Sequence, residues 1–173
     1  MYPSGDLYYG QHRNFVKEGW GKICYYNGSH YEGGWSNNAK NKRGRMFDNT
    51  CGDIYNGEYL DGKICGRGRM FYAALKEIYD GDWASDRRQG EGYLINRKGE
   101  ICTGDFRAGH MEGKLTYLRT LEKQEVDKLF KQFIESNDIF IYVTRGKHSL
   151  ELGPQSKAVQ SAKSFKNAVK ILQ

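Results

Sequence analysis

Charged side chains recur at regular places in this chain, and they are the first candidates for chemistry. Acidic residues alternate with aromatic residues and glycines in one kind of short segment, and basic residues follow glycines in another. The acidic set is Glu32, Glu58, Asp80, Asp82 and Asp105, and the basic set is Lys22, Arg45 and Arg69. General acid–base catalysis needs carboxylates in contrasting environments, whereas these carboxylates stand in equivalent contexts. We interpret the two sets as a solvated cross-strand charge ladder worth about 0.2–1 kcal/mol per pair, and we predict no catalytic residue.

Cysteines and histidines do not form a metal-binding pattern. The four cysteines (24, 51, 65 and 102) include no Cys-x-x-Cys pair, and the four histidines (12, 30, 110 and 148) are scattered. Zinc sites need such ligands at short, characteristic spacings, so we predict no metal and no cofactor. No secretory segment is recognisable, and free thiols in the cytoplasm are favoured over disulfides.

Paired glycines such as Gly66-Arg67-Gly68 superficially resemble phosphate-binding loops. A dinucleotide fingerprint requires three spaced glycines that lead into a helix, whereas here a strand is expected to follow. No nucleophile is paired with a base, so no hydrolase site is indicated. We therefore predict that the protein is not an enzyme.

Basic residues gather in segments that we expect to be loops between strands. They are Arg13 and Lys17, then Lys40, Lys42 and Arg43, then Arg87 and Arg88. On one edge of the fold they would contact anionic lipid headgroups or an acidic protein, although solvated loop tips are the favoured alternative. We predict no nucleic-acid partner, because acidic strands interrupt the basic loops and no known nucleic-acid-binding module matches.

The elements that would position these residues repeat along the chain. A phrase of the form Tyr-x-Gly-x-aromatic, or a variant of it, occurs five times, with central glycines at 10, 33, 57, 81 and 104. The period is therefore 23 or 24 residues. A second phrase, usually Gly-x-Gly, follows each copy; its residues are 19–21, 42–44, 66–68, 90–92 and 113–115. A fixed period of this length is typical of a repeat array.

The phrases Tyr31-Glu32-Gly33-Gly34-Trp35 and Tyr79-Asp80-Gly81-Asp82-Trp83, with the Gly-x-Gly phrase and the 23-residue step, resemble MORN repeats (membrane occupation and recognition nexus). The resemblance covers about residues 1–117, in five copies that start near residues 8, 31, 55, 79 and 102. His12 departs from the pattern in the first copy, and Cys102 and Leu115 depart from it in the fifth. These end copies are expected to be looser or to act as caps.

Alternation within each copy predicts a strand, then a six-to-eight-residue loop, then a second strand that starts at the Gly-x-Gly phrase. The predicted fold is mainly β, an elongated single-sheet solenoid of stacked β-hairpins with a C-terminal α-helical extension. A strand glycine is favourable where something approaches closely, so we expect an aromatic ring to lie over each one. Most of this aromatic face would pack internally, and ring rims would form a partner-binding groove, made by Tyr31, Trp35, Tyr55, Tyr59, Tyr79, Trp83 and Phe106.

The period stops at Tyr117, and residues 118–173 are predicted to be a helical cap and extension. A helix from about Leu121 to Ser136, capped by Thr120, would pack its apolar stripe on the open end of the last repeat. That stripe is Val126, Leu129, Phe130, Phe133 and Ile134. After a break at Asn137-Asp138, a strand is expected over Ile139–Val143.

A basic amphipathic helix is predicted from about Gln155, with Phe165, Val169 and Leu172 on its apolar seam. Three interpretations stay open: docking on the chain's own groove, docking on a partner, or, least favoured, lying on a membrane surface.

The resemblance implies a non-catalytic module, since MORN arrays occur alone and attached to lipid kinases, methyltransferases, junctional membrane proteins and cytoskeletal or axonemal assemblies. We predict an adaptor that binds partner polypeptides in a multi-subunit complex of the cytoskeleton, in a cilium or flagellum axoneme and similar to a radial spoke. Homodimerisation is a further possibility. The alternatives are a peripheral membrane tether that binds anionic phospholipids and a regulatory repeat fragment of a larger enzyme.

Overall fold

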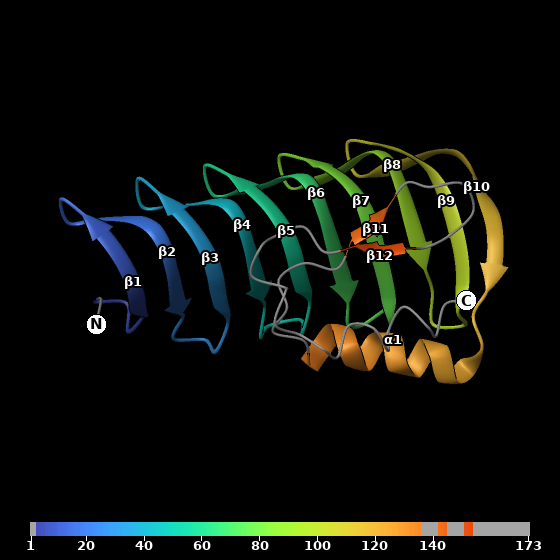
Figure 1. Ribbon diagram of the computed structural model, residues 1–173, viewed down its shortest axis with the longest axis horizontal. Coiled ribbons are helices and arrows are strands. Elements are labelled where there is room, and N and C mark those ends of the chain that lie inside the picture. Colours follow the sequence, from blue (N-terminus) through green and yellow to red (C-terminus); the bar gives the residue numbers. More distant parts are fainter. Residues whose placement is uncertain (1–2, 136–141, 145–150, 154–173) are drawn as a thin grey trace. The chain divides into compact units, whose positions relative to one another are not determined.

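The computed structural model describes residues 3–135, 142–144 and 151–153 of the 173-residue chain. The chain divides into two compact units, Met1–Glu135 and Ser136–Gln173. In the first unit, ten antiparallel strands form one sheet in which every strand pairs with its neighbours in sequence, from β1 to β10 (Figure 1). One helix, α1, follows the last strand. The predicted fold, a single sheet of hairpins with a C-terminal helix, is confirmed.

Each repeat is one β-hairpin, and the five hairpins follow one another without interruption. Their strands are β1 (Leu7–Arg13) and β2 (Val16–Cys24), β3 (His30–Ser36) and β4 (Ala39–Phe47), β5 (Ile54–Leu60) and β6 (Lys63–Tyr72), β7 (Glu77–Ala84) and β8 (Arg87–Ile95), β9 (Glu100–Arg107) and β10 (His110–Thr120). The helix α1 is Lys123–Glu135.

The loop inside each hairpin is only two residues long, so the predicted six-to-eight-residue loop is wrong. Both residues have positive φ, as in Asn37 (51°) and Asn38 (66°) or Asp61 (49°) and Gly62 (84°). Two-residue turns with this geometry match the twist of paired strands, and Asn, Asp and Gly adopt it most readily. The second strand therefore begins well before the Gly-x-Gly phrase.

A β-bulge explains why that phrase does not mark the start of a strand. Gly57 pairs with Gly68, but the next residue, Glu58, pairs with Cys65, so β6 carries two extra residues at this point. The first position of each second phrase has a φ between 57° and 89°; it is occupied by Gly19, Lys42, Gly66, Gly90 and Gly113. Glycine adopts this conformation without the steric penalty that a side chain brings, which accounts for the first glycine of the phrase.

The second glycine of the phrase joins the central glycine of the first phrase in one continuous row. Partners in adjacent strands include Gly33 with Gly44, Gly44 with Gly57, and Gly57 with Gly68. The row runs on through Gly81 and Gly92 to Gly104. The prediction that these glycines are neighbours across the sheet is confirmed.

The helix α1 packs on the face of the sheet opposite the aromatic rings, which we call the helix face. The ring of Phe71 lies 5.6 Å from that of Phe130 and 6.1 Å from that of Phe133, and the Arg45 guanidinium donates to the Phe133 and Ile134 carbonyls at 3.1 and 3.0 Å. Figure 1 shows α1 running across the strands. The predicted position on the open end of the last repeat is therefore wrong.

An apolar strip on the helix face gives α1 its place. Isoleucine precedes the first-phrase aromatic, or the cysteine that replaces it, in three copies, and these side chains are buried with others of the same face: Ile54, Phe71, Ile78, Ile95 and Ile101. Val126 and Phe133 are the buried residues of α1. The predicted cap residue Thr120 is instead the last residue of β10; the Glu122 N–H donates to the Glu125 carboxylate at 2.8 Å, as in one half of a capping box.

In the second unit, two short strands, β11 (Tyr142–Thr144) and β12 (Glu151–Gly153), pair antiparallel. The predicted strand overlaps β11. Its first residues, the break at Asn137-Asp138 and the last helix with Phe165, Val169 and Leu172 lie outside the described residues and stay predictions.

Candidate interaction surface

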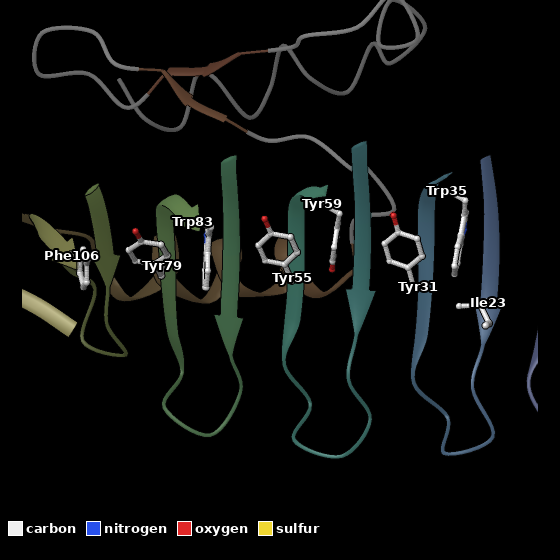
Figure 2. Packing of buried hydrophobic residues seen from close by; sticks show 8 residues of the cluster. All are labelled: Ile23, Tyr31, Trp35, Tyr55, Tyr59, Tyr79, Trp83 and Phe106. Carbon is white, nitrogen blue, oxygen red and sulfur yellow. The ribbon is translucent and has the colours of Figure 1, made fainter. Parts of the chain in front are cut away.

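The aromatic side chains of the first phrase form one ladder of rings on the face opposite α1, which we call the ring face. Successive rings meet edge to face, with centroids 5.3 Å apart for Tyr31 and Trp35, 5.2 Å for Tyr31 and Tyr59, and 5.6 Å for Tyr55 and Trp83. Figure 2 shows the labelled rings following one another along the sheet, turned alternately face-on and edge-on. Such contacts contribute about 0.5–1.5 kcal/mol each beyond the buried area.

The seven residues predicted to line a partner groove are all buried, with exposed fractions of 0–6%. Tyr31, Trp35, Tyr55, Tyr59, Tyr79, Trp83 and Phe106 are therefore the core of the array. The expected internal packing accounts for these rings, because rings of the same repeat and of adjacent repeats pack against them. A partner on this side of the sheet would meet the side chains that border the rings.

Each ladder tyrosine lies over the glycine row of its own hairpin. A Cβ at Gly44 or Gly68 would come within 3 Å of the Tyr31 or Tyr55 ring, so only glycine fits beneath the ring. The hydroxyl then donates to a carbonyl three residues further on, from Tyr31 to Gly34 at 2.9 Å. Burial raises the pKa of Tyr31 and Tyr79, which keeps each phenol protonated as a donor.

Each of the two ladder tryptophans connects its own hairpin to the one before it. Trp35 Nε1 donates to the Gly21 carbonyl at 3.1 Å, and Trp83 Nε1 donates to the Gly68 carbonyl at 3.0 Å. In both cases the acceptor is the second glycine of the preceding repeat. The first and second hairpins, and the third and fourth, are therefore joined by a side-chain hydrogen bond as well as by the strand ladder.

The two end copies depart from the pattern in different ways. In the first, the His12 ring takes the second aromatic position and lies 4.9 Å from the Tyr8 ring, edge to face. In the fifth, Cys102 replaces the tyrosine and Leu115 replaces the second glycine. A Cβ at Gly104 would lie 2.9 Å from Leu115 Cδ2, so the leucine occupies the space that a tyrosine ring fills elsewhere. The two departures of the fifth copy compensate for each other.

Three of the predicted loop cations lie on the ring face, each as the second residue of the second strand of a hairpin: Lys17, Lys40 and Arg88. Lys40 Nζ lies 5.8, 5.2 and 5.7 Å from the ring centroids of Tyr25, Tyr31 and Tyr59. Burial lowers the pKa of Lys40. Lys40 belongs to β4, so its predicted loop position is wrong, and its charge is stabilised by ring faces.

Arg88, in β8, repeats this arrangement. Its Cζ lies 4.7 and 4.9 Å from the Tyr72 and Tyr79 centroids, and its Nη2 lies 3.5 Å from Glu77 Oε1. The other four predicted cations are also strand residues. Arg13 is exposed at the end of β1, Lys42 is the exposed bulge residue of β4, Arg43 is half-buried beside it, and Arg87 is exposed at the start of β8. The seven residues therefore do not form one basic edge.

The charge ladder on the helix face is solvated in one part and buried in another. Lys22 and Glu32 lie 4.0 Å apart with about half of each side chain exposed, as predicted. Arg69 Nε donates to Asp80 Oδ2 at 2.9 Å, and both residues are almost fully buried. The solvated interpretation is therefore wrong for the Arg69–Asp80 pair, since this part of the helix face is packed.

Half-buried side chains border the ring ladder, and the sequence reasoning missed them. They are Tyr25, Met46, Met70, Tyr72 and Leu94, all packed against the buried rings. Met46, Met70 and Leu94 stand directly opposite Tyr31, Tyr55 and Tyr79 in the strand pairing. Their position two residues after the second glycine was a signal available in the sequence.

Several hairpin turns carry apolar side chains into solvent. Phe15 is fully exposed in the first turn, and Leu60 (59% exposed) and Met111 (46%) flank later ones. Arg13 and Lys63 stand close to these residues in sequence. The part of the chain that the structure describes contains no helix long and apolar enough to cross a membrane, and no group of three or more metal-binding side chains.

Comparison with known families gives one match. A family model described as MORN repeat matches residues 31–45, 55–74 and 79–100, which lie in the second, third and fourth hairpins. No curated protein matches the chain.

Proposed function

Because this chain is a MORN-repeat protein, and MORN repeats are non-catalytic modules that bind proteins or membranes, we propose that it is an adaptor that binds partner polypeptides on its ring face. The observation that carries the proposal is the buried ring ladder, which fixes the backbone of every hairpin relative to the next. A preformed surface loses little conformational entropy on binding, so shallow contacts along it add up to useful affinity.

The contact residues in this proposal are the side chains that border the buried rings. Tyr25, Met46, Met70, Tyr72 and Leu94 follow one another from hairpin to hairpin and are only half-buried. Tyrosine and methionine are enriched at protein interfaces, because they combine apolar area with adaptable shape or a polar tip. In this proposal the contact surface is formed by the half-buried side chains, and the seven rings predicted to line a groove lie beneath it and support it.

The setting we propose is a multi-subunit cytoskeletal assembly, with the axoneme of a cilium or flagellum and a radial-spoke-like complex as the specific case. MORN arrays occur in such assemblies, and a series of joined hairpins suits the spacing of subunits. The array would comprise about residues 1–117, and residues 118–173 would be its extension. Regulation of an attached enzyme and homodimerisation remain predictions.

Site-specific photocrosslinking tests the adaptor proposal. A photoreactive residue at Met70 on the ring face is compared with one at Glu32, a partly exposed residue of the helix face. We expect the Met70 position to crosslink to one polypeptide of a cytoskeletal extract, saturably and in competition with unlabelled protein. Met46→Glu should weaken that crosslink. Equal labelling from Glu32, or none from Met70, would contradict the proposal.

A second candidate, peripheral membrane binding, is supported by the exposed apolar turn residues with basic neighbours. Phe15 and Leu60, beside Arg13 and Lys63, are suited to insertion between headgroups combined with attraction to anionic lipid. Sedimentation with phosphatidylserine and phosphoinositide vesicles tests it: binding should fall as salt rises and should be lost in Phe15→Asn. Sedimentation that is unchanged in Phe15→Asn would exclude the turns as the membrane contact.

A further inference from the structure

A pocket of about 460 Å³ lies where the first two hairpins adjoin, at the turns that lead from one hairpin to the next. Its walls include two tyrosines, Tyr25 and Tyr26, and its apolar part is Met46. Two carboxylates, Asp6 before β1 and Asp48 after β4, also line it. The pocket is bounded by rings and acids from two separate repeats, and the adaptor function makes no use of its charge.

Both carboxylates are held in place by the backbone. Asp6 Oδ1 accepts from the Tyr26 N–H at 2.9 Å, and Asp48 Oδ1 accepts from the Thr50 N–H at 2.8 Å. This N–H lowers the pKa of Asp48, so its carboxylate is ionised at neutral pH. The Ser4 hydroxyl also donates to Asp6 Oδ2 at 2.8 Å, and side chains of Ser29, Thr50 and Cys51 donate to Asp48. A carboxylate has about four acceptor sites, so Asp6 can accept further hydrogen bonds, whereas Asp48 contributes mainly its charge.

Neither carboxylate is neutralised by an ion pair. Asp80, Glu77 and Glu32 each have a basic partner within 4.0 Å, but among the described residues Asp6 and Asp48 have none. Lys17 and Lys40 attract Asp6 and Asp48 respectively without forming an ion pair, and both ammonium groups lie over rings: Lys40 Nζ lies 5.2 Å from the Tyr31 centroid, and Lys17 Nζ lies 4.7 Å from that of Trp35. The pocket therefore presents two negative charges and two tyrosine rings together.

We propose that this pocket receives an arginine side chain of the polypeptide partner, with its guanidinium at the Asp6 and Asp48 carboxylates and its methylenes on Met46. The proposal rests on the proposed function, because the arginine belongs to the bound polypeptide. A planar guanidinium stacks on tyrosine and also donates several hydrogen bonds to carboxylates, whereas a lysine ammonium is a compact, strongly hydrated charge. The combination of rings and two carboxylates thus selects arginine.

Methyl NMR on the full chain tests the pocket without the natural partner. The probe is N-acetyl-L-arginine N′-methylamide, and the reporter is the Met46 methyl group, with the Met70 methyl as an internal reference outside the pocket. We expect a saturable shift of Met46 alone. Asp48→Asn and Asp6→Asn should each raise the dissociation constant at least fivefold, since Asn keeps an acceptor oxygen for the backbone N–H but loses the charge. The matched control, Asp61→Asn, removes one carboxylate from an exposed hairpin turn and should leave the constant unchanged.

Each other outcome overturns the proposal. If Asp61→Asn weakens probe binding as much as the pocket variants do, the effect reflects the net charge of the protein and not the pocket. Tighter binding of free L-arginine than of the capped probe would indicate a small-molecule site, and equal binding of the capped lysine analogue would remove the selectivity for arginine. If the probe fails to shift Met46 while the Met70 photocrosslink persists, the pocket assignment is wrong and the adaptor function stands. If the Met70 crosslink is absent, the adaptor function itself is wrong.

Discussion

Restoring the missing tyrosine and glycine of the fifth copy tests whether a ladder tyrosine requires a glycine beneath its ring. Leu115→Gly alone removes a half-buried side chain and adds a strand glycine, which should cost about 2 kcal/mol of unfolding free energy. Cys102→Tyr alone places a ring where Leu115 Cδ2 already lies against Gly104, and overpacking of this kind costs about 2 kcal/mol. Independent effects would sum to about 4 kcal/mol.

The double variant should instead lie within about 1 kcal/mol of the native protein. A tyrosine at 102 would cover two glycines, as Tyr79 covers Gly81 and Gly92, and would gain an edge contact with Phe106. Its hydroxyl would reach the carbonyl three residues on, a hydrogen bond worth about 1 kcal/mol. The expected coupling energy is therefore about 3 kcal/mol, at the upper end for residues in contact.

Urea unfolding of the full chain, followed by tryptophan fluorescence and near-ultraviolet circular dichroism, measures the cycle. Leu115→Gly combined with Lys22→Gln is the control, because Lys22 lies in the first hairpin on the opposite face, and this pair should be additive. A Cys102→Tyr/Leu115→Gly protein that loses the full 4 kcal/mol would refute the matched exchange.

Three further predictions concern the bulge, the buried ion pair and the core phenols. Lys42→Gly should raise stability by about 1 kcal/mol in urea unfolding, because Lys42 holds a φ of 59° where the other copies have glycine, and Gly66→Ala should have the opposite sign. Asp80→Asn should lower stability by about 3 kcal/mol, since it leaves the buried Arg69 charge without its partner, whereas Lys22→Gln at the exposed pair should change it by less than about 1 kcal/mol; equal effects would contradict the packed helix face. Burial raises the pKa of Tyr31, Tyr59 and Tyr79, so their stabilisation is complete below the unfolded tyrosine pKa of about 10 and is lost as pH rises towards the folded values; ultraviolet titration should show their phenolates only as the sheet signal disappears.

The register of the array could be predicted because the period and the glycine positions are explicit in the sequence. Gly33, Gly57 and Gly81 recur at one step, and any stack of hairpins brings them into one row. The hairpin turns could not be predicted in the same way, because the bulge glycine and the row glycine stand two residues apart and serve different purposes. The prediction takes both glycines as the start of the second strand. Residues that precede them in that strand, such as Lys40 and Arg88, are therefore assigned to loops.

The place of α1 was also beyond the reach of a pattern in the helix alone. Its apolar stripe shows that it packs, but not on which surface. The deciding residues are Ile54, Ile78 and Ile101, which create an apolar strip on the helix face. The interaction surface was mislocated for a related reason: a ring repeated in every copy was expected to contact both a partner and its neighbours, whereas contact with neighbours buries it fully.

The span of α1 makes the two ends of the sheet unequal. The helix starts beside the turn before β9, where a side chain at Gly99 would meet Val126, and it ends at Arg45 in β4. Hairpins under this brace gain support across several strands at once, whereas Tyr8 and its hairpin depend on the one neighbour that follows. Thermal opening should therefore begin at β1 and travel towards the helix, and hydrogen exchange should register it as a gradient. The acid-lined pocket lies at this less stable end of the sheet, so a ligand bound there would hold the first two hairpins together and raise their stability against local opening.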